Sequence, residues 1–73
     1  MKTKYEFLKN LIESRTVGLI QRILLNHLEA MKDNIEPKEI DKTYAQLFES
    51  FLLNFIYTND EREYFRSLYM ETI

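Results

Sequence analysis

Apolar residues recur along this chain at spacings of three and four, which place them on one face of a helix. The fullest stripe runs through residues 40–57 and consists of Ile40, Tyr44, Leu47, Phe48, Phe51 and Phe55. At about 100° per residue, Leu53 and Tyr57 point to the opposite side of that helix. Leu52 and Ile56 widen the main face toward them. This helix is therefore apolar on two sides, and we expect a partner to cover the second.

Two capping boxes and a proline mark the starts of helices. Thr3 and Glu6 form the first box, and Thr58 and Glu61 form the second at the same spacing. The first helix would bury Tyr5, Leu8, Leu11 and Ile12, and the last would bury Tyr64, Phe65, Leu68 and Tyr69. Pro37 suits a first helical turn, where its missing N–H is harmless. Residues 33–37 therefore end one helix and open the next.

Residues 14–18 weaken the helical pattern. Ser and Thr compete for backbone hydrogen bonds, and Gly18 costs about 1 kcal/mol relative to Ala inside a helix. We expect a break here, with a single bent helix over 3–32 as the alternative. The following helix would bury one broad face made of Val17, Ile20, Ile23, Leu24, His27, Leu28 and Met31. Leu25 lies on its polar side and is a second candidate for a partner contact.

Length and composition narrow the class of protein. A chain of 73 residues forms one domain, so residues 1–73 are predicted to be a single helical domain, an all-α bundle of three or four helices. With 45% apolar and 30% charged residues, one Gly and one Pro, the composition fits such a bundle. The chain has no Cys, so packing must hold it together. Its apolar runs are too short for a membrane span or a signal peptide, so we expect a cytoplasmic protein.

Charge is divided unevenly along the chain. Residues 1–32 carry six basic and three acidic groups, whereas residues 33–73 carry four basic and nine acidic groups. Opposite halves attract, which favours a folded-back monomer or a dimer that pairs unlike ends. The acidic residues Asp60, Glu61 and Glu63 are candidates for contact with a basic partner. Ordinary solvated helix faces remain the simpler interpretation of these charges.

Residues suited to catalysis or metal binding are few. His27 is the single histidine, and its place on an apolar face predicts a partly buried ring satisfied by hydrogen bonding. The four carboxylates of residues 33–41 lack the alternating Asp/Asn spacing and turn Gly of a calcium loop. We predict no catalytic residue, no metal site and no cofactor, and hence a protein that is not an enzyme.

Two short segments are similar to a known family. Lys2, Thr3 and Tyr5, followed by the segment Thr16-Val17-Gly18-Leu19-Ile20-Gln21-Arg22-Ile23, resemble the Hha-type modulators. That resemblance implies a small helical protein that acts by binding nucleoid proteins. It covers a minority of the chain and requires gaps. The polar signature of the family's third helix is replaced by Leu47-Phe48-Glu49-Ser50-Phe51, so no functional residue is carried over.

These observations predict a small non-enzymatic regulator or inhibitor that binds a protein through a helical surface and forms a homodimer. The predicted partner-binding residues are Leu25, Leu53, Ile56, Tyr57, Asp60, Glu61 and Glu63. One alternative is a DNA-binding transcriptional regulator, in which the phosphate contacts would come from Lys2, Lys4, Lys9, Arg15 and Arg22. The acidic segment 33–37 and the very apolar helix after it disfavour that alternative. A structural assembly subunit is the other.

Overall fold

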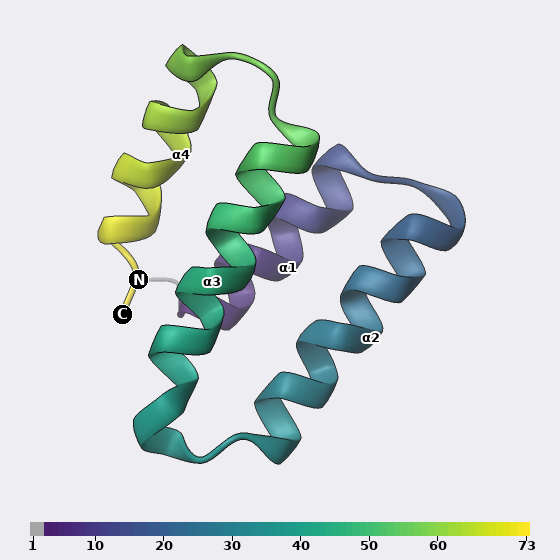
Figure 1. The fold of residues 1–73 in the computed structure, drawn as a ribbon, viewed down its shortest axis with the longest axis vertical. Coiled ribbons are helices and arrows are strands. Elements are labelled where there is room, and N and C mark those ends of the chain that lie inside the picture. The colour runs from purple at the N-terminus through teal and green to yellow at the C-terminus, as the bar shows by residue number, and fades with distance from the viewer. Residues whose placement is uncertain (1–2) are drawn as a thin grey trace.

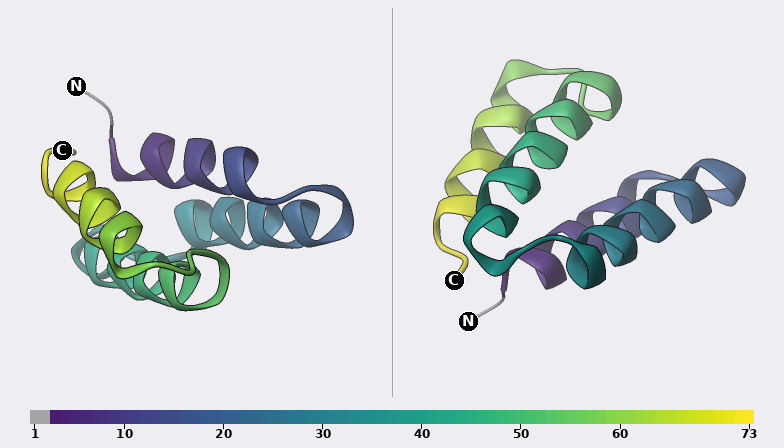
Figure 2. Two further views of the ribbon diagram at one scale, coloured as in Figure 1. Left: turned by 90° about the horizontal axis from the view of Figure 1, so that it is seen from above. Right: turned by 60° about the horizontal axis from the view of Figure 1, so that its bottom comes forward.

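A computed structural model of the protein describes residues 3–73. Within that range the chain forms four helices: α1 (Lys4–Arg15), α2 (Gly18–Asn34), α3 (Pro37–Phe55) and α4 (Asn59–Met70). Figure 1 shows α2 and α3 side by side at their lower ends and spreading apart toward the top, with α4 beside α3. Figure 2 shows α1 packed across one side of the layer that α2 and α3 form. The predicted all-α bundle is confirmed for the described residues.

Both predicted capping boxes begin a helix. The Thr3 hydroxyl accepts from the Glu6 N–H, and the Thr58 hydroxyl accepts from the Glu61 N–H, each at 3.2 Å. In both boxes the glutamate side chain accepts from the threonine hydroxyl, at 3.3 and 3.2 Å. The two bonds from Glu6 and Glu61 satisfy N–H groups that a first helical turn leaves without a backbone partner, and the two bonds to the glutamate side chains orient the hydroxyls. Helices α1 and α4 therefore start where the sequence indicates.

The break between α1 and α2 is real, so the alternative of one bent helix is wrong. The Thr16 hydroxyl donates to the Ile12 carbonyl at 2.6 Å, and the Gln21 amide donates to the Thr16 carbonyl at 2.7 Å. Gly18 has φ of +69°, in the left-handed region that favours glycine. An added Cβ at Gly18 would meet open space. Glycine is therefore favoured there by the backbone conformation and not by a lack of room.

The core lies where α1, α2 and α3 meet. Its buried apolar residues are Leu8, Leu11, Ile12, Leu28, Met31, Tyr44, Phe48, Phe51, Leu52 and Ile56. They include three of the four residues predicted for α1 and three of the six in the α3 stripe. The ring of Tyr69 stacks on that of Phe48 with centroids 4.3 Å apart and so attaches α4 to the core. Tyr64 is exposed, so the prediction that it is buried is wrong.

Polar contacts fix α4 further. The Arg62 Nε donates to the carbonyls of Ile56 at 2.8 Å and Leu52 at 3.2 Å. Arg66 forms ion pairs with Glu49 at 2.9 Å and Glu63 at 2.7 Å. Over residues 3–73, none of the helices is long and apolar enough to cross a membrane.

Candidate protein-binding surface

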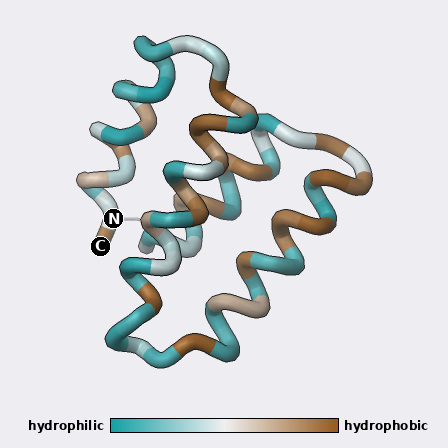
Figure 3. Tube along the Cα trace, in the orientation of Figure 1, coloured by the Kyte–Doolittle hydropathy of each residue, from teal (hydrophilic) through white to brown (hydrophobic). Residues whose placement is uncertain are grey.

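Helix α2 is apolar on two sides, and only one of them faces the core. Leu28 and Met31 are buried, whereas Leu19, Ile20 and Ile23 are 69%, 53% and 56% exposed. We call the surface made by Leu19, Ile20 and Ile23 the α2 face. In Figure 3 hydrophobic residues appear along the first half of α2, and Val17, just ahead of the helix, is exposed too.

The α2 face continues along the helix past Ile23. Residues 23, 27 and 30 share one side of a helix at 3.6 residues per turn, and both His27 and Ala30 are exposed there. The sequence predicts that the imidazole of His27 is partly buried, and that prediction is wrong. Ala30 therefore extends the aliphatic surface toward the C-terminal end of α2, and the exposed imidazole of His27 lies between it and Ile23.

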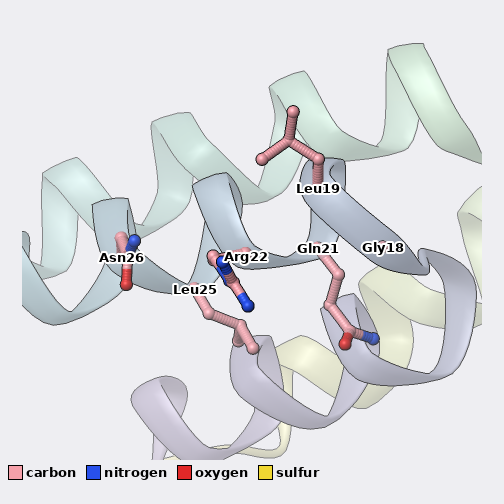
Figure 4. Close-up of a pocket in the computed structure, with 6 residues that line it drawn as sticks. All are labelled: Gly18, Leu19, Gln21, Arg22, Leu25 and Asn26. Carbon is pink, nitrogen blue, oxygen red and sulfur yellow. The ribbon is translucent and has the colours of Figure 1, made fainter.

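The orientation of α2 differs from the sequence prediction, which placed Ile20 and Ile23 in the core and Leu25 on the polar side. In the structure Leu25 is half-buried and packs against the core. In Figure 4 Leu25 and Gln21 point toward α1, and Leu19 points away from it. The reason is the short connection at Thr16 and Val17, because it folds α2 back against α1 and turns residues 21, 25 and 28 inward.

A hollow of about 540 Å³ lies beside the α2 face, where α2 passes over α1. Its lining residues are Gly18, Leu19, Gln21, Arg22, Leu25 and Asn26. Arg22 is the one charged residue among them. The surface next to the exposed aliphatic side chains is therefore concave.

A charged edge runs along α2 beside the α2 face. We call Arg22, Asn26, Glu29 and Asp33 the α2 edge, because spacings of three and four place them on one side of the helix. Glu29 accepts a hydrogen bond from the Tyr5 hydroxyl. Among the described residues neither Arg22 nor Asp33 forms an ion pair. The edge is thus basic near the start of α2 and acidic near its end.

The other predicted partner-binding residues lie around the connection from α3 to α4. Leu53 and Tyr57 are exposed, as the pattern of two apolar sides predicts. Ile56 is only 1% exposed and belongs to the core, so it is not accessible to a partner in this fold. Asp60 is exposed, whereas Glu61 pairs with Arg15 at 2.9 Å and Glu63 pairs with Arg66.

The side chains that could support other chemistry are scattered. In the part of the chain that the structure describes, there is no group of three His, Cys, Asp or Glu residues that could hold a metal ion. Burial raises the pKa of Tyr69 to about 12, with Asp41 and Tyr44 adding to the effect. Burial, together with Glu29, Asp41 and Asp33, also raises the pKa of Tyr44. Both phenols therefore stay protonated at neutral pH.

Comparison of the chain with protein-family models, with curated proteins and with solved structures gave no match. Function is therefore inferred from the surface itself. The sequence pattern did contain a signal for the α2 face. Apolar residues occupy well over half of the circumference of α2, more than one contact with a core can cover, although the prediction assigned most of them, including Ile20 and Ile23, to the core.

Proposed function

We propose that this protein is a small regulator that works by binding another protein through its helical surface. The observation that carries the proposal is the α2 face, on which three large aliphatic side chains in one turn and a half of helix are each more than half exposed. Contiguous exposed apolar surface beside polar residues is typical of protein interaction sites. Single exposed apolar residues, such as Leu53 among polar neighbours, are common on any protein surface.

The charged residues favour a protein partner over duplex DNA. Arg15 is paired with Glu61, and Arg66 is paired with two glutamates. Arg62 is directed at the backbone carbonyls at the end of α3. The α2 edge mixes one arginine with two carboxylates, which would repel phosphates. A structural assembly subunit would use the same exposed surface, so it is a variant of this proposal.

A capture experiment from the native host tests the proposed function. The bait is the full chain, compared with Ile23→Glu, with Leu53→Glu and with Lys9→Gln, a control at an exposed position on α1. We expect a defined protein to be retained by the wild type and by Lys9→Gln. We expect Ile23→Glu to lose it while circular dichroism shows an unchanged helical content, and we expect Leu53→Glu to retain it.

Direct binding to duplex DNA is the contrary result. Its affinity would fall steeply with salt, and removing Arg15 and Arg22 would reduce that dependence by about one unit of slope for each lost phosphate contact. Tight binding of this kind, with no protein retained, would overturn the proposal.

A further inference from the structure

We infer that a second copy of this chain covers the α2 face, with the two α2 helices packed antiparallel about a twofold axis near Asn26 and His27. The inference rests on the proposed function, because it names the first protein that the surface binds. Three features of α2 support it: the arrangement of large and small residues on the face, the order of charges along the edge, and the state of the helix N-terminus.

Large residues occupy the start of the α2 face and the small Ala30 lies near its end, an order that suits antiparallel self-packing. With the axis between residues 26 and 27, Ile23 of one copy lies opposite Ala30 of the other. The same pairing occurs a second time by symmetry, as isologous contacts require. Packed helices approach to about 8–10 Å between axes when the contact residues are small enough. Ala30 supplies the space that Ile23 needs.

The order of charges on the α2 edge selects the antiparallel arrangement. In an antiparallel helix pair, each edge meets the same edge of the partner in the reverse direction. Arg22 near the start of α2 therefore lies opposite Glu29 and Asp33 near the end of the partner's α2, and this happens twice. A parallel pair would bring the edge against the side of α2 that carries Leu24 and Met31, where Arg22 finds no carboxylate. Rim charges of this kind fix register and orientation.

The start of α2 lacks the side-chain cap and the acidic first-turn residue that the starts of α1 and α4 have. No side chain caps the N-terminus of α2, and its first turn holds no acidic residue. The positive end of a helix dipole is stabilised by a nearby negative charge. In the antiparallel pair, Asp33 of the partner lies opposite the first turn of α2. A second copy thus supplies the negative charge that the chain does not place there itself.

Sedimentation equilibrium of the full chain is the first test. The wild type should be a dimer at high micromolar concentration and should dissociate in the low micromolar range. Ile23→Glu should be a monomer with unchanged helical content, because Ile23 contributes little to the core. Leu53→Glu is the matched control: an apolar residue of similar exposure, on α3, that should leave the dimer intact.

A charge exchange tests the orientation of the pair. Arg22→Glu and Asp33→Lys should each weaken the homodimer by about tenfold, since each variant disrupts two symmetry-related rim contacts. Mixed together, the two variants should form a heterodimer more stable than either homodimer. In that heterodimer the two substituted side chains face each other with opposite charges, and the unchanged Arg22 of one variant faces the unchanged Asp33 of the other. Failure of the mixture to form heterodimers would overturn the antiparallel arrangement.

Single cysteines locate the axis, because the chain has no Cys of its own. A disulfide needs Cα atoms within about 7 Å. His27→Cys should therefore form a disulfide-linked dimer under mild oxidation. Ile20→Cys should not, because in an antiparallel pair the two copies of position 20 lie at opposite ends of the contact. Linkage at position 20, with or without linkage at position 27, would indicate a parallel pair and overturn the inference.

The inference and the proposed function fail in distinguishable ways. A wild type that stays monomeric at high concentration would overturn the inference. If host capture by that monomer still depends on Ile23, the proposed function stands with a different partner on the α2 face. A dimer lost with Leu53→Glu and retained with Ile23→Glu would also overturn the inference, and would assign the contact to α3.

Discussion

Tyr69 joins α4 to the core through its ring, while its hydroxyl has no hydrogen-bond partner. The ring stacks on Phe48 and meets Phe7 edge to face at 5.8 Å between centroids. The buried oxygen is the one side-chain polar atom without a partner in the described part of the core. An unsatisfied buried hydroxyl costs about 1–3 kcal/mol. The contribution of Tyr69 to stability therefore comes from its ring.

Replacement of that hydroxyl should stabilise the protein. We expect Tyr69→Phe to raise the free energy of unfolding by about 1 kcal/mol, because the ring contacts remain and the unsatisfied group is removed. Urea denaturation followed by circular dichroism measures the change. Tyr64→Phe, at an exposed position, is the control and should have no effect. Destabilisation by Tyr69→Phe would mean that the hydroxyl makes a bond in solution.

The raised pKa of Tyr69 predicts a loss of stability in alkali. A phenol is neutral when protonated, and the folded state holds the proton up to a pKa of about 12, compared with an ordinary value of 10.0. The unfolded chain therefore releases its proton first as the pH rises. The stabilisation is complete below pH 10 and is lost between about 10 and 12. Tyr69→Phe should show a smaller loss over this range, and an identical loss in both proteins would contradict the assignment.

At the scale of the helices, the sequence predicted where helices start and break better than it predicted which side of α2 faces the core. Capping residues act locally, so Thr3 and Thr58 could be identified without knowledge of the fold. The apolar stripe of α3 could also be predicted, because its aromatic residues recur at helical spacing on one side of the helix. Which side of α2 packs against the core could not be predicted, because α2 is apolar on both sides. The choice depends on how residues 16–17 direct α2 against α1.

Arg62 connects two helices, and its loss should cost more than the loss of Arg66. Its Nε donates to two carbonyls at the end of α3, where the helix dipole is negative. We expect Arg62→Met to lower the free energy of unfolding by about 1.5–3 kcal/mol, the range for hydrogen bonds to a charged group. Arg66→Met should have a smaller effect, because the ion pairs that it breaks are exposed and screened by solvent. Equal costs in denaturant titrations would refute this distinction.

At the scale of the whole molecule, the small core gives a physical reason for further apolar contact through the exposed α2 face. A domain of this size buries only about 60% of the surface that its unfolded chain exposes, so the homodimer that we infer would add apolar contact to a small core. From the sequence the homodimer contact was expected at Leu53 and Tyr57, whereas we infer it at the α2 face. Leu53 and Tyr57 are both exposed in the structure.

The most direct test of the central claim is the dependence of amide NMR signals on protein concentration. On dilution of the labelled wild type into the low micromolar range, we predict shifts of the signals of residues 19–30 and of Asp33. The signals of Leu53 and Tyr57 should stay in place. The same experiment on Ile23→Glu should show no dependence on concentration. Signals that are constant everywhere in the wild type, or that move at Leu53 and Tyr57 and not along α2, would contradict an interface on the α2 face.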